Sequence, residues 1–216
     1  MTAERRFPHH LGPDGSFAVC GPRAILTGNR GILHDAPSRA RSARWRHKAW
    51  ISCTLNLRAD RAKLPLTAPG HYTPLFFTDE AVALAAGHRP CALCRRAAFL
   101  DFQSAWREAT GRLLRAPEID QLLHTARLSN RRPAQHSADC AALPDHSFIR
   151  SGDLTGRLLG DALLPLTAKG YGAAQPRPRG SVCVLTPAPL LDVLRAGYQP
   201  ALTRAQDRAS WPDTRS

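Results

Sequence analysis

The sequence predicts an α+β fold. Its 216 residues include 15 glycines and 18 prolines, which predicts many turns and short elements and argues against a helical bundle. Between residues 49 and 96, strand-like segments and a short helical segment surround a pair of cysteines. Short apolar runs separated by Gly, Asp and Pro then follow between residues 148 and 185. We therefore expect a β-hairpin and short helices around the cysteine turn, followed by a small antiparallel sheet or barrel.

The size and composition of the chain favour one folded unit. A 23.6 kDa chain with 43% apolar residues can bury one substantial core. Polar segments rich in Pro, Gly or charge occupy both ends of the chain. We expect a single α+β domain over residues 16–203, with flexible tails at 1–15 and 204–216.

Three elements are expected in the first half of the chain. A short strand at 16–25 precedes a glycine turn at 27–31. Segments 49–58 and 71–77 have strand composition, and we expect them to form a hairpin whose long tip spans 59–70. Thr78 can cap a short helix that ends at Ala86, because Gly87 can adopt the left-handed conformation that terminates helices.

Three more helices are expected further along. Phe99, Phe102 and Trp106 recur at spacings of three and four, which predicts an amphipathic helix over 94–110. Segment 118–128 follows Pro117 and has helical composition, as does 189–196 before Gly197. The short apolar runs at 148–149, 154–159, 162–166 and 182–185 are the expected strands of the second sheet.

The charge of the chain points to a polyanionic partner. The formal net charge is +13 and the isoelectric point is near 10.7. We find no apolar stretch long enough to span a membrane and no apolar core of a secretory signal near Met1, so we expect a cytosolic protein, at the nucleoid if it binds DNA. Six cysteines in that compartment are typical of metal ligands or buried thiols rather than of disulfides.

The sharpest local motif is the Cys-x-x-Cys pair formed by Cys91 and Cys94. Two thiolates at this spacing can bind one metal ion from a single turn, and zinc is the usual occupant. The alternative is that both cysteines are simply small residues in a tight turn. The spacing favours zinc.

The surroundings of this pair extend the motif. An aromatic strand ends at Phe76 and Phe77, a short Ala-rich helix follows, and Gly-His-Arg-Pro-Cys-x-x-Cys-Arg then spans 87–95. Over residues 49–96 this arrangement resembles the zinc-binding domain of the bacterial Ada-type methyl-DNA repair proteins. The resemblance implies zinc bound by Cys91, Cys94 and Cys53, the last matching one cysteine of the family's N-terminal pair.

The sequence departs from the Ada pattern at one ligand. The positions four before and four after Cys53 are Ala49 and Leu57, so the second cysteine of the N-terminal pair is missing. Histidine readily completes a cysteine-rich zinc site, and the candidates for the fourth ligand are His71, His34, His47 and Cys20, with His71 or His34 favoured. The resemblance also implies a phosphotriester methyl acceptor as an alternative function, with Cys53 accepting the methyl group.

A basic stretch precedes Cys53. Guanidinium groups bind phosphate oxygens, and an indole ring can stack on a base, so this stretch is a candidate nucleic-acid contact. A solvated charged loop is the alternative, and Arg131 and Arg132 add to the basic supply. The candidate nucleic-acid-binding residues are Arg39, Arg41, Arg44, Trp45, Arg46, Lys48, Arg95 and Arg96.

Two acid and histidine pairs are candidate catalytic residues. His34 and Asp35 follow a glycine turn, and Asp120 and His124 are four residues apart on one face of an expected helix. Such groups can act as a general base or hold a divalent ion, while the alternative is an ordinary surface pair. If these four residues converge, the chain is a DNA-processing enzyme of nuclease or base-excision type.

No phosphate-binding loop, dinucleotide fingerprint or nucleophile elbow is present, so no nucleotide cofactor is expected. Cys183 lies in an apolar run and is expected to be a core thiol. Together these observations predict a cytosolic zinc- and DNA-binding protein of DNA repair or processing, with the zinc in a structural role. DNA is favoured over RNA, and an RNA-binding module remains an alternative.

Overall fold

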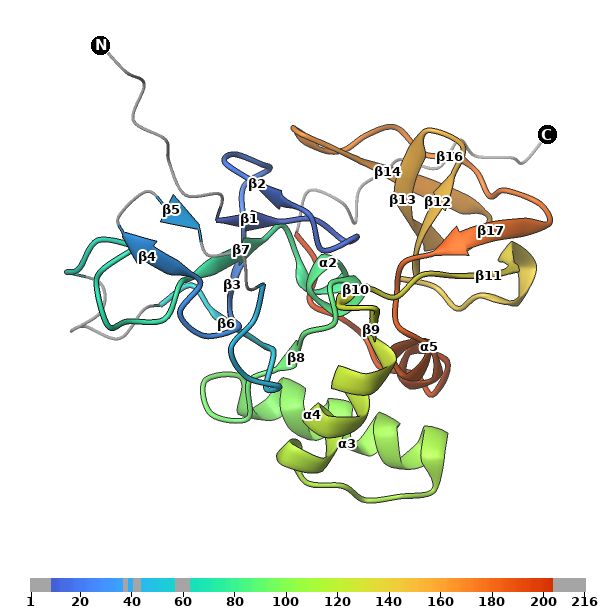
Figure 1. Cartoon of the computed structure of the whole chain (residues 1–216). Coiled ribbons are helices and arrows are strands. Elements are labelled where there is room, and N and C mark those ends of the chain that lie inside the picture. The colour runs from blue at the N-terminus through green and yellow to red at the C-terminus, as the bar shows by residue number, and fades with distance from the viewer. Residues whose placement is uncertain (1–8, 37–38, 41–43, 57–62, 204–216) are drawn as a thin grey trace, which may run out of the picture.

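The computed structural model describes residues 9–36, 39–40, 44–56 and 63–203 (Figure 1). It is an α+β structure, as the sequence predicts, with helices and two main sheets. Residues 1–8 and 204–216, part of the expected tails, lie outside the described residues. Residues 9–15 do not form a flexible tail as expected, because β1 (His10–Leu11) pairs with two other strands of the first sheet.

The first sheet has the strand order β2-β1-β7-β3-β6-β8. Its strands, besides β1, are β2 (Phe17–Ala18), β3 (Leu26–Asn29), β6 (Ile51–Thr54), β7 (Leu75–Phe77) and β8 (Arg89–Pro90). A separate pair comprises β4 (His34–Ala36) and β5 (Arg39–Ala40).

The expected hairpin between segments 49–58 and 71–77 is wrong. Strand β3 lies between β6 and β7 and pairs antiparallel with both. Glycine at position 28 of β3 permits this arrangement, since a Cβ atom there would lie 2.3 Å from the ring of Phe77. The segment expected as a glycine turn is therefore mostly the central strand of the sheet.

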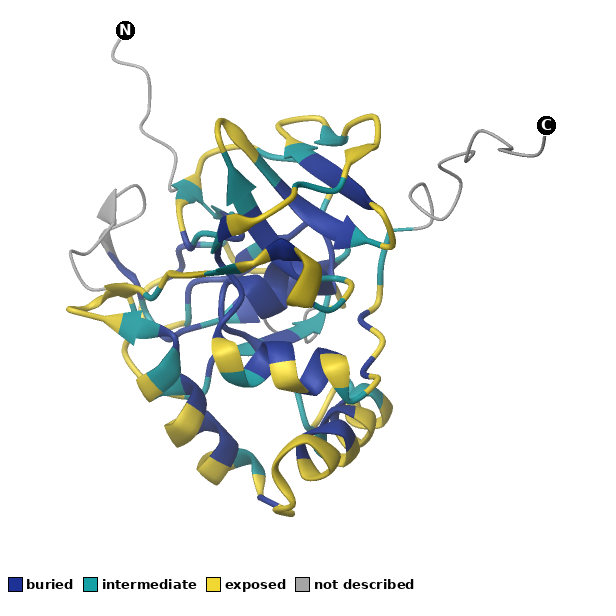
Figure 2. Cartoon of the chain, turned by 90° about the vertical axis from the view of Figure 1, so that its right-hand side faces the viewer, coloured by how far each residue is buried: buried dark blue, intermediate teal, exposed yellow. Residues whose placement is uncertain are grey.

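Helix α2 (Glu80–Ala85) is buried along its whole length between the two sheets (Figure 2). The cap is Asp79 rather than the expected Thr78, and its carboxylate accepts a hydrogen bond from Val82 N–H at 2.9 Å. Gly87 follows the helix with φ +81°, the left-handed conformation that the sequence predicts. Apolar residues of α2 pack with Leu26 and Phe77 of the first sheet and with Phe148 of the second.

Three helices form a second layer below the first sheet in Figure 1. They are α3 (Arg96–Thr110), α4 (Ala116–Ala126) and α5 (Ala188–Arg195), and each agrees with an expected helix. Phe102 and Trp106 of α3 pack with Ile119 of α4 and Leu190 of α5. Phe99 is buried as well, so the predicted apolar stripe of α3 faces the core.

The second main sheet is antiparallel and open, and among the described residues it does not close into a barrel. Its apolar face packs on α5 through Ile149, Leu158 and Leu191. The expected strands at 148–149, 154–159, 162–166 and 182–185 are confirmed. Its strands are β11 (His136–Asp139), β12 (Phe148–Ser151), β13 (Leu154–Leu159), β14 (Ala162–Thr167), β15 (Gly170–Tyr171), β16 (Gln175–Pro176) and β17 (Ser181–Val184).

Two short strands, β9 (Leu128–Ser129) and β10 (Arg132–Pro133), pair after α4, and a 3-10 turn spans Cys140–Ala142. Among the described residues, no helix is both long enough and apolar enough to span a membrane.

Candidate metal centre

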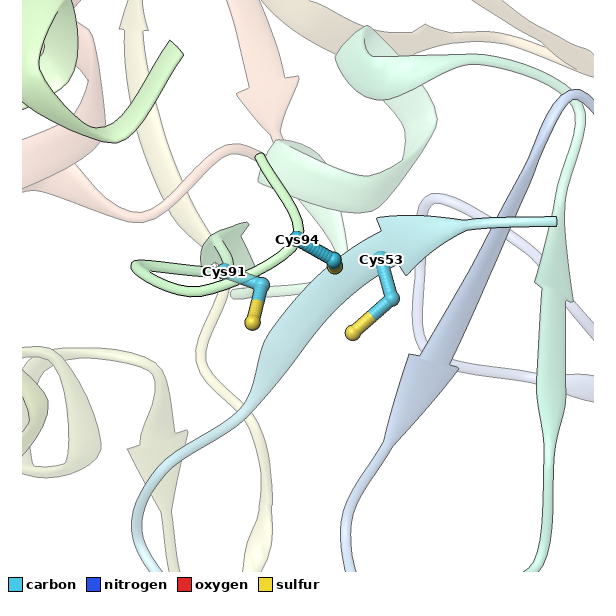
Figure 3. A group of neighbouring side chains, drawn as sticks. All are labelled: Cys53, Cys91 and Cys94. Atoms are coloured by element: carbon cyan, nitrogen blue, oxygen red, sulfur yellow. The ribbon is translucent and has the colours of Figure 1, made fainter. Parts of the chain in front are cut away.

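The register of two strands brings the three predicted cysteine ligands together. Strands β6 and β8 are parallel, with Ser52 opposite Pro90, and Cys91 N–H donates to the Ser52 carbonyl at 2.9 Å. Cys53 is the next residue of β6, so it lies beside Cys91. Figure 3 shows the Cys53 side chain on β6 next to the turn that carries Cys91 and Cys94.

The spacing of the sulfur atoms suits a tetrahedral metal ion. The three Sγ atoms lie within 4.8 Å of one another. Zn–S bonds of about 2.3 Å in a tetrahedron place sulfur atoms roughly 3.8 Å apart, so a small contraction of this group would accommodate zinc. Three thiolates can hold a zinc ion and fix the strand to the turn.

Hydrogen bonds within the group favour a thiolate at Cys91. The Cys53 thiol donates to the Cys91 sulfur and lowers the pKa of Cys91 to about 4, while burial opposes that shift. The backbone N–H groups of Leu93 and Cys94 also lower this pKa, and Leu93 N lies 3.5 Å from Cys91 Sγ. The pKa of Cys53 is raised correspondingly, first by its hydrogen bond to Cys91 and then by burial. Anionic sulfur at Cys91 is the form that binds metal.

The candidate fourth ligands lie outside this group of three. His71, the favoured candidate, is exposed, and its Nδ1 lies 3.0 Å from the Pro69 carbonyl. His34, the other favoured candidate, is buried, with Nδ1 2.6 Å from Thr73 Oγ1. His47 and Cys20 are exposed residues that do not join the thiols either.

Arg95 belongs to the support of the metal turn rather than to a nucleic-acid surface, which corrects the sequence-based expectation. Its guanidinium donates two hydrogen bonds to Glu80, at 2.8 and 2.7 Å, and one to Ser52 Oγ at 2.9 Å. Glu80 is buried and also accepts from the Tyr198 hydroxyl and from Ala201 N–H. This ion pair therefore holds the residue after Cys94 against β6, α2 and the segment after α5.

Asp120 is engaged in a second buried ion pair. Arg89 donates to both of its carboxylate oxygens, at 2.9 and 2.7 Å. Arg89 lies in β8, immediately before Pro90 and the metal turn, so this pair ties α4 to the first sheet. The Asp120 carboxylate is occupied by this bidentate contact rather than directed at His124.

The predicted catalytic residues do not form a common site among the described residues. His34 contacts Thr73, whereas His124 lies beside Arg127, whose Nη2 is 2.9 Å from its Nδ1. Burial and the nearby Arg127 and Lys48 charges lower the pKa of His124. The side chain of Asp35 lies outside the described residues. The structure thus provides no assembled acid and base pair for the enzymatic alternative.

No protein-family model matches this chain, and neither the curated proteins nor the solved structures contain a significant match. The Ada-like resemblance therefore depends on the motif itself, and the geometry of the three thiols is the independent observation beside it.

The basic stretch leads directly into the strand that carries Cys53. Arg44, Arg46 and Lys48 are exposed and Trp45 is half-buried, while the side chains of Arg39 and Arg41 lie outside the described residues. Lys48 Nζ donates to Gln121 of α4 at 2.6 Å. Arg96, the first residue of α3, is also exposed. We define the strip formed by Arg44, Trp45, Arg46 and Lys48 as the basic strip.

A buried stack behind the basic strip was not predicted from the sequence. The guanidinium carbons of Arg30 and Arg127 lie 3.5 and 3.8 Å from the ring centroid of Trp50. Two groups this close to one centroid must occupy opposite faces of the ring. Arg30 also donates to the Ala86 carbonyl and to His88 Nε2. Because residues 30, 50, 88 and 127 are distant in sequence, no local pattern could have indicated this stack.

The stack is cationic and has no carboxylate within ion-pair distance among the described residues. Burial lowers the pKa of Arg127 to about 9, and burial, Arg127 and Arg44 lower that of Arg30. Trp45 lies at the edge of the stack, with its ring centroid 5.9 Å from that of Trp50 and 5.8 Å from that of His124. The stack fixes Trp45 in place and adds positive potential behind the strip.

Proposed function

We propose that this chain is a zinc-binding protein that binds nucleic acid, with DNA the favoured partner, and that it acts in DNA repair or processing. The observation that carries the proposal is the convergence of Cys53, Cys91 and Cys94 from two distant segments, with all sulfur atoms within 4.8 Å. Three convergent thiols with metal-ligand spacing, in a chain with little reason to form disulfides, favour zinc.

Zinc at these thiols would serve a structural purpose. It would join β6 to the turn that begins α3, alongside the buried Arg95–Glu80 pair. The basic strip lies on the approach to the same strand, so the metal would stabilise the segment that presents Arg44, Trp45, Arg46 and Lys48.

The basic strip supports the nucleic-acid part of the proposal. Exposed cations flank an indole held at the edge of a rigid stack, which combines phosphate contacts with a stacking face. The net charge of +13 adds long-range attraction to a polyanion.

Two measurements on tag-free protein test the proposal. Elemental mass spectrometry is expected to find about one zinc per chain in protein purified with reduced thiols and without chelator. Fluorescence anisotropy is then expected to show DNA binding that weakens as salt rises. Absence of zinc would overturn the metal part, and tighter binding of single-stranded RNA than of duplex DNA at matched salt would replace DNA by RNA.

A further inference from the structure

The chain supplies three ligands to the candidate zinc site, whereas zinc in proteins is almost always four-coordinate. All six cysteines and all nine histidines of the sequence lie within the residues that the structure describes. Among those residues only Cys53, Cys91 and Cys94 form a group that could hold a metal ion. The fourth ligand is therefore not a cysteine or histidine of this chain in the described arrangement.

The remaining cysteines are held elsewhere in the fold. Cys140 is fully buried in the core of the second sheet. Cys183 lies on β17 of that sheet, where its sulfur is 3.4 Å from Gln135 Oε1. Cys20 is exposed but follows β2, at the opposite edge of the first sheet from β8. A side-chain rotation cannot bring any of these sulfurs to the three thiols.

The outer side of the group is open to solvent. Cys94 is exposed, and Leu93 between the two turn cysteines is 86% exposed. No element of the described chain therefore covers the turn from outside. A ligand from solution can approach the metal position without a rearrangement of the fold.

From this geometry we infer that the fourth coordination position takes a thiolate from a small molecule in solution. The inference rests on the proposed zinc binding. A site of three sulfur ligands favours another soft ligand over carboxylate or carbonyl oxygen. The bond formed is zinc to sulfur, and the thiol proton passes to solvent, so no oxidant or reductant is required.

The surroundings favour the added negative charge. Zn²⁺ with three thiolates carries a net charge of −1 by formal count, and a fourth thiolate lowers it further. Helix α3 begins two residues after Cys94, and its N-terminal donors have no side-chain cap. The positive end of this 15-residue helix and the exposed Arg96 both offset that charge.

Cobalt substitution and X-ray absorption test the inference. The experiment uses the full chain carrying Cys20→Ser with Cys183→Ser, which removes two thiols outside the group and keeps all three ligands. We expect zinc absorption spectra to show three sulfur neighbours in a thiol-free buffer containing a phosphine reductant. After addition of 2-mercaptoethanol we expect four, and in Co²⁺-loaded protein the visible bands should shift with saturation at one thiol per metal.

Several outcomes would overturn the inference. Four sulfur neighbours before any thiol is added would mean that the protein completes the site, and loss of the fourth on dilution to monomer would assign it to a second copy. A spectrum with three sulfurs that does not respond to the thiol would also overturn it. These outcomes leave zinc binding intact, whereas protein that binds neither zinc nor cobalt would instead contradict the proposed function. Gel filtration after thiol addition checks that the metal remains on the protein.

Discussion

At the scale of single residues, Cys94 is the ligand whose replacement gives the clearest test. It is exposed and makes no core contact, so Cys94→Ser removes a metal ligand with little direct effect on packing. We expect zinc to fall from about one per chain to near zero, and added zinc to raise the melting temperature of the wild type only. Cys20→Ser, another exposed cysteine, is the control and should retain its metal. Equal zinc contents in the two variants would contradict the site.

His88 makes stability depend on pH. Burial, together with the Arg30 and Arg127 charges, lowers the pKa of His88 well below 6.5, so the folded protein keeps this ring neutral. Below about pH 6.5 the unfolded chain binds a proton there that the folded chain does not, and stability falls by up to about 1.4 kcal/mol per pH unit. The contribution is fully present above that pH.

Urea unfolding of His88→Gln between about pH 7.5 and about pH 5.5 measures this effect, because glutamine can still accept from Arg30. We expect the variant to lose less stability on acidification than the wild type, with zinc held constant in both. His136→Gln, at an exposed histidine on β11, should acidify like the wild type. A variant as pH-sensitive as the wild type would remove His88 from this role.

Sequence reasoning at this scale succeeded where chemistry is local and failed where a partner is distant. The spacing of Cys91 and Cys94 is visible in one turn, and Cys53 came from the family resemblance. The role of Arg95 was predicted wrongly because its partner, Glu80, lies fifteen residues earlier on another element. Asp120 was paired with His124 on helical spacing alone, whereas its bidentate partner is Arg89, thirty-one residues away.

At the scale of elements, the helices were predictable and the order of the strands was not. Helix α3 carries an apolar stripe with helical period, and Gly87 marks the end of α2, so both can be recognised within a short window. The pairing of β3 between β6 and β7 depends on the fit of Gly28 against Phe77, which lies in a segment about fifty residues later. That fit is a three-dimensional property that local alternation does not contain.

The Arg95–Glu80 pair predicts how the elements around the metal depend on one another. Both side chains are at most 7% exposed, and Glu80 also holds Tyr198 and Ala201. Glu80→Gln leaves the Arg95 charge buried without its counter-ion, which is expected to cost about 3–5 kcal/mol in unfolding free energy. The variant should also bind zinc more weakly, because Arg95 follows Cys94 directly.

Chemical unfolding and zinc titration of the same protein measure both effects. The control is Asp192→Asn, which removes a carboxylate from an exposed pair with Arg195 and should cost less than about 1 kcal/mol. Similar losses in the two variants would mean that the buried pair does not anchor the turn.

At the scale of the whole molecule, the excess positive charge and the fold meet at the basic strip. A net charge of +13 attracts any polyanion, so overall charge alone does not identify a binding face. The strip differs from other exposed arginines because it adjoins the Arg30–Trp50–Arg127 stack, which adds buried positive charge behind it. Phosphate contacts at this face should therefore contribute more than the same number of charges elsewhere.

Replacing two cations of the strip tests this argument. For Arg44→Ala with Arg46→Ala, we expect weaker binding to duplex DNA and a slope of log affinity against log salt that is smaller by roughly 1.8. The matched control, Arg107→Ala with Arg112→Ala, removes the same charge from exposed positions at the end of α3. It should leave the slope nearly unchanged. If both double variants reduce the slope equally, DNA responds to net charge rather than to the strip, and the binding face must be sought elsewhere.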